Sequence, residues 1–198
     1  MQSVSGYTLT ELLGKGTYGE VFKAIDRQTR NTAAVKRISK KTLCARAVDN
    51  LIEEIRILKE LRHRNITQLI DFTWDSNYVY MFMEYLSGGD LSHFLRSQKR
   101  LPERVIRYFL QQLAFALHYL FHKNIVHMDI KPQNILLTSS TPPTLKITAI
   151  RDRHISRFLN HLMEPGRQGA DIRLANSNGN IVLSGRIVVV VLSRVTVA

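Results

Sequence analysis

Apolar residues recur with a period of two in five short stretches of the first 84 residues, which is the pattern of half-buried β-strands. The stretches are residues 7–13, 20–24, 32–38, 66–72 and 78–84. Between the third and the fourth, apolar side chains recur at helical spacing and predict a helix of about four turns: Val48, Leu51, Ile52, Ile55 and Leu58. The pattern therefore predicts a five-stranded antiparallel sheet beside one helix.

The pattern becomes helical after residue 86. Gly88 and Gly89 interrupt the chain, and Asp90 is placed to cap a short helix that continues to residue 97. Pro102 is typical of a helix start and predicts a long helix to about residue 122. Apolar residues surround this helix almost completely, which predicts burial on all sides by neighbours that the rest of the chain must supply. Together the two parts predict an α+β fold.

A glycine-rich segment, GKGTYGEV, occupies residues 14–21 between the first two predicted strands. Because glycine lacks a side chain, backbone N–H groups in such a segment can approach nucleotide phosphates. Alone, the three glycines are equally typical of an ordinary hairpin turn. Lys36 follows Val21 by fifteen residues on the third strand, and Glu54 follows eighteen residues later on the helix. This spacing predicts that Lys36 reaches the α- and β-phosphates and that Glu54 pairs with it.

A second motif, HMDIKPQN, occupies residues 127–134 and places a carboxylate, a lysine and an amide within six residues. Phosphoryl transfer uses these groups, because a carboxylate accepts the hydroxyl proton, a cation offsets charge on the moving phosphoryl group, and an amide oxygen binds magnesium. We therefore interpret Asp129, Lys131 and Asn134 as catalytic residues, with Asn134 also the candidate Mg2+ ligand.

With these motifs, residues 6–147 resemble a eukaryotic serine/threonine protein kinase. Four stretches are similar to the autophagy-initiating Unc-51-like kinases, nearest the third, Hedgehog-linked branch: residues 9–14 (LTELLG), 68–76 (QLIDFTWDS), 83–91 (MEYLSGGDL) and 131–137 (KPQNILL). The resemblance implies a two-lobed kinase fold with ATP and Mg2+ as cofactors. It implies that Asp129 is the catalytic base, that Lys131 contacts the γ-phosphate and that Asn134 holds one magnesium. Asp90 would face the ribose.

The same resemblance implies a set of nucleotide-binding residues. Val21 and Ala34 would cover the adenine on one side and Leu136 would support it from the other. Glu84 and Leu86 would offer backbone groups of the hinge between the lobes. The full set comprises Leu13, Gly14, Gly16, Gly19, Val21, Ala34, Lys36, Glu54, Glu84, Leu86, Asp90 and Leu136.

Three positions depart from the family pattern. Met128 stands where many kinases have an arginine that binds an activation-loop phosphate. When residues 145–147 are aligned with the strand before Asp-Phe-Gly, Ala149 replaces the metal-binding aspartate and Ile150 the phenylalanine. Loss of that carboxylate should cost about 3 kcal/mol or more of transition-state stabilisation, roughly a hundredfold in rate. Asp152 is an alternative carboxylate, although a displacement of three residues redirects its side chain.

The composition changes after residue 147. The last 51 residues contain seven Arg, no Lys and one aromatic residue, Phe158, whereas the preceding 147 contain ten Lys and eleven Arg. We interpret the change as a difference in coding origin, such as a frameshift or a retained intron. The sequence thus predicts three parts: a kinase N-lobe and hinge (1–86), a partial, truncated helical C-lobe (87–147) and an unrelated tail (148–198).

The tail lacks an Ala-Pro-Glu segment and a recognisable set of large-lobe helices, so the long helix that starts at Pro102 would leave apolar faces bare. Within the tail, Asp152 could cap a helix and residues 171–184 could form a hairpin around Asn178-Gly179. Residues 187–192 form either a further strand or an aggregation-prone segment.

The net charge of +12 is spread along the chain, with +8 in residues 1–147 and +4 in residues 148–198. A diffuse charge without interleaved aromatic residues predicts a solvated basic surface and no nucleic-acid partner. The one cysteine, Cys44, excludes an internal disulfide and suits a reducing compartment. Neither a signal peptide nor a transmembrane segment is indicated, which predicts a cytoplasmic protein.

Three functions follow from these observations. The first is an ATP-dependent serine/threonine kinase that transfers the γ-phosphate to protein hydroxyls, with catalysis impaired by the missing Asp-Phe-Gly and activation segment. The second is a catalytically inactive fragment that binds nucleotide or competes for the full-length kinase's partners. The third is a mis-spliced product without a stable fold. We favour a kinase lineage with little or no activity; the protein substrate is unknown, and the resemblance implies partners from autophagy or Hedgehog signalling.

Overall fold

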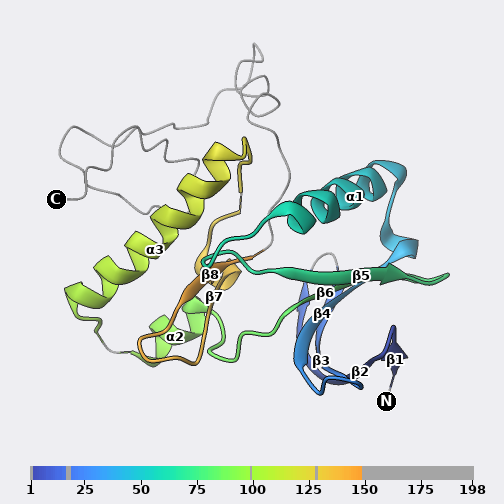
Figure 1. Cartoon of the computed structure of the whole chain (residues 1–198), viewed down its shortest axis with the longest axis horizontal. Helices are drawn as coiled ribbons and strands as arrows, with labels where there is room; N and C mark the ends of the chain where they lie inside the picture. Colours follow the sequence, from blue (N-terminus) through green and yellow to red (C-terminus); the bar gives the residue numbers. More distant parts are fainter. Residues whose placement is uncertain (1, 17–18, 99, 128, 149–198) are drawn as a thin grey trace, which may run out of the picture.

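The computed structural model describes residues 2–16, 19–98, 100–127 and 129–148, and Figure 1 shows their arrangement. The tail helix, hairpin and strand predicted from the sequence lie outside the described residues. Met128, Ala149, Ile150 and Asp152 lie outside them as well.

The N-terminal part is a six-stranded sheet in which every neighbouring pair of strands is antiparallel. Its strands are β1 (Ser3–Val4), β2 (Tyr7–Gly16), β3 (Gly19–Asp26), β4 (Thr32–Ser39), β5 (Leu69–Trp74) and β6 (Tyr78–Glu84). Across the sheet they run in the order β1-β2-β3-β4-β6-β5. The five predicted strands are present as β2 to β6, and the two-residue β1 extends the edge by pairing with β2.

Asp75 fixes the connection between β5 and β6. Oδ1 of Asp75 accepts hydrogen bonds from the backbone N–H groups of Asn77 and Tyr78, both at 2.7 Å, and Oδ2 accepts from the Tyr80 hydroxyl at 2.8 Å. These bonds close the turn between β5 and β6, as expected for an aspartate that mimics a backbone turn. The turn lies between the predicted strands 66–72 and 78–84.

The alternation along β6 divides the core between the two faces of the sheet. Tyr80 and Phe82 belong to a cluster with β2 to β4, whereas Met81 and Met83 belong to the larger cluster on the opposite face. All four are buried. The period of two read from the sequence thus corresponds to two separate hydrophobic layers.

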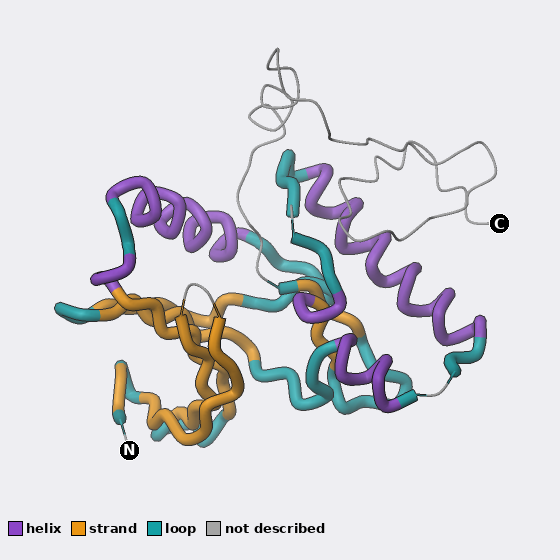
Figure 2. Tube along the Cα trace, turned by 180° about the vertical axis from the view of Figure 1, so that it is seen from behind, coloured by secondary structure: helices purple, strands orange, loops and turns teal. Residues whose placement is uncertain are grey.

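The helix α1 (Ala45–Glu60) packs on the second of these layers, after the short 3-10 helix η1 (Lys40–Thr42). Its predicted apolar stripe buries Leu51, Ile55 and Leu58, while Ile52 remains 60% exposed. Figure 2 shows α1 alongside the sheet, and α3 farther away on the other part of the molecule. The tertiary position of α1 is set by this one apolar face.

The C-terminal part combines helices with a two-stranded sheet. Its elements are α2 (Leu91–Ser97), α3 (Glu103–His122), η2 (Pro132–Asn134), β7 (Ile135–Leu137) and β8 (Leu145–Ile147). The Asp90 carboxylate caps α2 by accepting from the His93 N–H at 2.8 Å, and Pro102 is the N-cap of α3. Both predicted helix starts are confirmed.

The predicted strand 66–72 was wrong at its beginning, because β5 starts at Leu69. The preceding residues bond to β8 instead: the Thr67 N–H donates to the Ile147 carbonyl, and the Ile147 N–H donates to the Asn65 carbonyl, both at 2.9 Å. Ile66 forms an isolated parallel bridge with Ile147. A local pattern cannot distinguish this long-range pairing from continuation of the strand.

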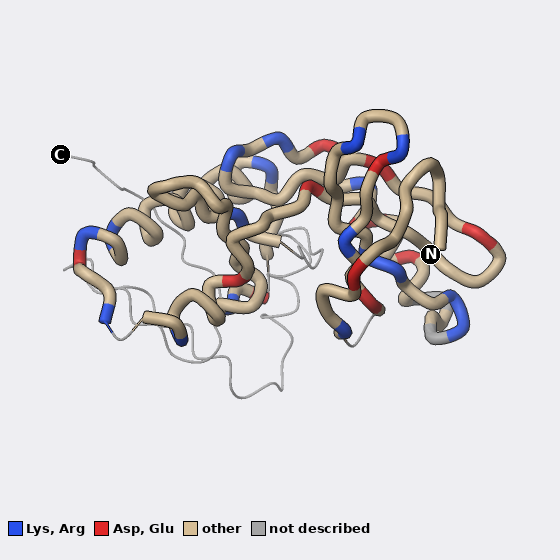
Figure 3. The backbone as a smooth tube through the Cα atoms, turned by 90° about the horizontal axis from the view of Figure 1, so that it is seen from below, with Lys and Arg blue, Asp and Glu red and all other residues tan. Residues whose placement is uncertain are grey.

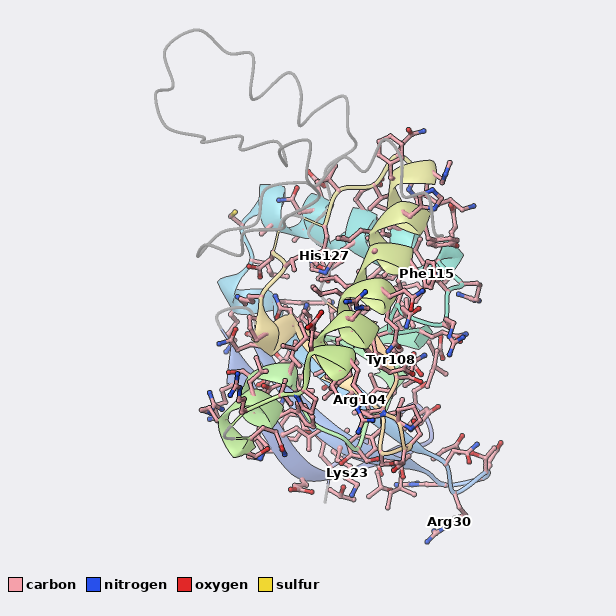
Figure 4. All side chains as sticks on the ribbon, turned by 90° about the vertical axis from the view of Figure 1, so that its left-hand side faces the viewer. Lys23, Arg30, Arg104, Tyr108, Phe115 and His127 are labelled. Atoms are coloured by element: carbon pink, nitrogen blue, oxygen red, sulfur yellow. The ribbon has the colours of Figure 1, made fainter. Side chains whose placement is uncertain are left out.

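The prediction that α3 is buried on all sides was also wrong. Phe109, Ala116 and Leu120 are buried, but Phe115 and Phe121 are 48% and 47% exposed. Figure 4 shows Arg104, Tyr108 and Phe115 following one another along this helix. Within the described part of the chain, α3 therefore packs along one face and keeps other apolar side chains exposed. This agrees with the expectation that the helix starting at Pro102 would leave apolar faces bare.

Acidic and basic residues both occur along the backbone of the N-terminal part (Figure 3). Glu20 illustrates the mixing, because its carboxylate lies 3.1 Å from Lys15 Nζ and 2.5 Å from an Arg37 nitrogen. The absence of a nucleic-acid partner stays a prediction. Among the described helices, none is long and apolar enough to cross a membrane.

Candidate active site

The glycine-rich segment forms the end of the β2–β3 hairpin. Gly14 pairs with Val21 and Gly16 pairs with Gly19, whereas residues 17–18 are not described. Gly19 has a φ of +150°, and a Cβ there would collide with the carbonyl oxygen of Arg37. Only glycine suits this position, because other residues would meet both the strained backbone and the collision. Leu13, just before the hairpin end, is 41% exposed.

Lys36 and Glu54 lie in contact, as their spacing predicts. Lys36 is on β4 directly opposite Val21, and its Nζ lies 3.3 Å from Oε1 of Glu54 on α1. The side chains are 25% and 20% exposed, so water screens the pair only in part. The contact holds the ammonium group on the side of the sheet that α1 covers. Ala34, two residues before Lys36, is opposite Met83 on β6.

The three predicted catalytic residues also converge. The side-chain amide of Asn134 donates to the backbone carbonyl and to Oδ2 of Asp129, both at 2.8 Å. Lys131 Nζ lies 3.1 Å from the same Oδ2. The side chain of Lys131 is 48% exposed, and that of Asp129 25%. The segment from Asp129 to Asn134 thus places a lysine ammonium group and an amide N–H group beside one oxygen atom of the Asp129 carboxylate.

His127 holds the loop that carries Asp129 through two hydrogen bonds. Its side chain is almost fully buried, and Nε2 lies 2.8 Å from the Thr148 carbonyl oxygen. Nδ1 accepts from the Asp129 N–H at 3.3 Å, so the neutral ring with its proton on Nε2 satisfies both contacts. Burial lowers the pKa of His127 from 6.5 to about 4, although the Thr148 carbonyl and the Asp129 charge oppose that change. The ring is therefore neutral at pH 7.

Thr148, the last described residue, is tied to the catalytic loop by both of its backbone groups. Its carbonyl accepts from His127, and its N–H donates to the Asn134 carbonyl at 3.0 Å. The chain therefore leaves β8 in direct contact with the loop that carries Asp129. Ala149 is the next residue in the sequence.

Sequence reasoning missed an ion pair at the end of β6. Both carboxylate oxygens of Glu84 lie close to Lys146 Nζ on β8, at 2.7 and 2.9 Å, and Oε1 also accepts from the Gln68 N–H at 2.8 Å. The resemblance implied only a backbone role for Glu84. The available signal was Lys146 itself, a lone charge between the buried residues Leu145 and Ile147 that therefore points away from them.

Asp90 and Leu136 are brought side by side. They form an isolated antiparallel bridge, supported by a bond from the Leu137 N–H to the Gly89 carbonyl at 2.9 Å. The Asp90 carboxylate has a structural task already, since it caps α2. Leu86, between β6 and this bridge, is half-buried. The ribose and adenine roles of these residues stay predictions.

The donor atoms agree in kind with Mg2+, which prefers oxygen ligands and keeps several waters. Asn134 carries an amide oxygen, and its amide nitrogen bonds to the Asp129 carboxylate. Within the described ranges, no group of three or more His, Cys, Asp and Glu side chains could hold a metal ion. The described residues therefore fit part of a magnesium site, and the alternative carboxylate, Asp152, lies outside them.

Comparisons with known proteins agree with this geometry. The family profile described as "Protein kinase domain" matches residues 7–157. Human serine/threonine-protein kinase ULK3 is 51% identical over 145 residues, which cover 73% of this chain and 31% of that protein. Human ULK1 is 42% identical over 159 residues, which cover 77% of this chain and 15% of that protein. The predicted resemblance to Unc-51-like kinases is confirmed.

A solved structure extends the agreement to three dimensions. The crystal structure of Rad53 1-466 in complex with AMP-PNP aligns with a TM-score of 0.66 at 36% identity, covering 73% of this chain and 38% of that one. The chain spans about a third or less of the length of the two human relatives. The predicted boundaries at residues 86 and 147 stay predictions. From its sequence profile, its relatives and its kinase-like fold, the chain belongs to the protein kinase domain family.

Proposed function

We propose that this chain binds ATP through a kinase-type site and that its phosphoryl transfer is strongly reduced. The observation that carries the first half is the contact between Lys36 and Glu54, at 3.3 Å. In protein kinases this ion pair must be in place for the lysine to engage the α- and β-phosphates. The pair holds the Lys36 ammonium group on the side of the sheet that α1 covers.

The catalytic loop supports the same proposal. The Asp129 carboxylate would orient a substrate hydroxyl and accept its proton, since its position is fixed by Asn134. Lys131 would offset charge on the transferred phosphoryl group. Asn134 would hold one Mg2+, which supplies charge neutralisation between the phosphates when it is bound.

The second half of the proposal rests on Ala149. A methyl group cannot bind metal, and the expected loss is about 3 kcal/mol of transition-state stabilisation, or roughly a hundredfold in rate. Binding of ATP without metal would be affected less, because the contacts from Lys36 and the glycine-rich turn do not involve residue 149. We therefore expect nucleotide binding with a weak dependence on Mg2+. Partners from autophagy or Hedgehog signalling stay predictions from the resemblance, and the cytoplasmic location stays a prediction from the sequence.

Nucleotide binding is tested by titrating the chain with ATP, with and without MgCl2, in a calorimeter. We expect Lys36→Met to weaken ATP at least tenfold. The matched control is Lys59→Met, an exposed lysine on α1 whose ammonium group lies over the Phe72 ring, and it should leave the affinity unchanged. Absence of ATP binding, or equal binding by Lys36→Met and the parent chain, would contradict the proposal.

The cause of the reduced transfer is tested by a triple replacement, Ala149→Asp with Ile150→Phe and Arg151→Gly. We expect this variant to phosphorylate itself or a basic protein substrate about a hundred times faster than the parent. Addition of Asp129→Asn to the triple variant should remove the gain. A parent chain as active as the triple variant would show that Ala149 is not the limiting residue.

A further inference from the structure

Two histidines lie one turn apart at the C-terminal end of α3. His118 and His122 are both exposed, and their Nε2 atoms are 3.1 Å apart. The ring centroids are 4.4 Å apart and the ring planes meet at 76°. Residues at positions i and i+4 share one face of a helix, so the backbone itself holds the two imidazoles together.

This separation suits two ligands of one metal ion. Zinc binds imidazole nitrogen at about 2.0–2.1 Å, so two nitrogens on one ion are about 2.9 Å apart at a right angle and about 3.3 Å apart at a tetrahedral angle. The observed 3.1 Å lies between these values. Imidazole nitrogen selects zinc, copper and nickel, whereas magnesium and calcium prefer oxygen.

The surroundings of His118 and His122 differ from those of His127 and His63. The His127 ring is buried and bonded to the Thr148 carbonyl, and His63 stacks on Tyr119 while its Nδ1 accepts from a backbone N–H. His118 and His122 point their Nε2 atoms at each other on an exposed surface, where an ion can enter.

We propose that His118 and His122 form a two-nitrogen site for Zn2+, Cu2+ or Ni2+, with both Nε2 atoms as ligands. In the part of the chain that the structure describes, no third His, Cys, Asp or Glu joins them. The proposal therefore assigns two protein ligands and leaves the other coordination positions to water. Without metal, one Nε2–H donates to the other Nε2. On metal binding that ring carries its proton on Nδ1, and both Nε2 lone pairs point to the ion.

The position gives the site a structural effect. α3 ends at His122, and only four residues separate that end from His127, which anchors the catalytic loop. A metal ion that joins consecutive turns stabilises the folded form, because the unfolded chain does not hold the two nitrogens at this separation. Metal binding should therefore protect the backbone amides of the last turn of α3 against hydrogen exchange.

The test is calorimetric titration of the untagged chain with CuCl2, NiCl2 and ZnCl2 in a non-coordinating buffer. We expect one equivalent bound, with copper the tightest of the three. His118→Gln and His122→Gln should each weaken copper at least tenfold. His93→Gln removes an exposed histidine from α2 and should leave the affinity unchanged.

Electron paramagnetic resonance of the copper form provides a second readout. Hyperfine coupling to two nitrogens is expected in the parent chain, and to one nitrogen in each single variant. Absence of binding, or equal copper affinity in the parent and in His118→Gln and His122→Gln, would overturn the proposal. Since ATP is not part of this experiment, either result is independent of nucleotide binding.

Discussion

Acidification from pH 7 to pH 4 should destabilise the parent chain by more than it destabilises a His127→Gln variant. The His127 ring is almost fully buried and neutral, and the cost of burying a charge there exceeds the stabilisation that the Thr148 carbonyl and the Asp129 carboxylate would give it. Gln retains an N–H group that can donate to the Thr148 carbonyl, as His127 Nε2 does. The variant therefore removes the titration while it preserves the main contact.

The sign and the size follow from the two pKa values of His127, 6.5 in the unfolded chain and about 4 in the folded one. Above pH 6.5 the ring is neutral in both states and contributes no pH dependence. Between pH 6.5 and 4 the unfolded chain binds a proton that the folded chain does not, so the free energy of unfolding decreases as the pH falls. Each unit of difference corresponds to about 1.4 kcal/mol, which gives a loss of about 3 kcal/mol at pH 4.

The assay is urea unfolding of both chains at pH 7, 6, 5 and 4, followed by circular dichroism. The pKa values of Asp26 and Asp75 are lowered by hydrogen bonds from backbone N–H groups, and these carboxylates also lose stabilisation in acid. They are common to both chains, so their effect cancels in the difference. If the two free energies of unfolding fall in parallel, or if the variant falls more steeply, burial of a neutral His127 is not what determines the acid sensitivity.

Three further substitutions test the packing around the site by urea unfolding at pH 7. Gly88→Ala should cost about 1–3 kcal/mol, because its Cβ would lie 2.6 Å from the Leu137 carbonyl oxygen, and an unchanged midpoint would contradict this close packing. Lys146→Met should cost about 1–2 kcal/mol by leaving the partly buried Glu84 carboxylate without its cation, whereas Lys146→Arg should retain most of the stability. Asp90→Ala should cost about 1 kcal/mol through loss of the α2 cap, and Asp90→Asn should lose less.

The secondary structure followed from the sequence wherever the signal was local. The bounds of β6 and the two starting residues Asp90 and Pro102 agree with the structure, because alternation and helix capping depend on near neighbours in the chain. The burial of α3 did not follow. Its apolar residues could be counted from the sequence, but the number of elements that pack on them could not.

Contacts between segments that are distant in the sequence were not predicted either. Residues 66 and 67 look like the start of a strand, yet the Thr67 N–H donates to the Ile147 carbonyl and Ile66 forms a bridge with Ile147 on β8. The ion pair of Lys146 with Glu84 joins residues 62 positions apart. The alternation of apolar and polar residues shows which face of a strand a residue occupies. It does not show which distant segment packs on that face.

The candidate site combines a local and a longer-range contact. Asp129, Lys131 and Asn134 meet within one short segment, so a short motif was sufficient to place them. Lys36 and Glu54 lie on a strand and a helix, and their pairing was predicted from the spacing between two motif residues. The structure adds that Thr148 is bonded to the catalytic loop through its N–H and its carbonyl. Because both backbone groups of Thr148 are hydrogen-bonded, the chain up to residue 148 does not need to rearrange for Ala149→Asp to act. The expected gain in phosphoryl transfer therefore depends on the restored carboxylate and the two replacements beside it, rather than on a new path of the preceding strand.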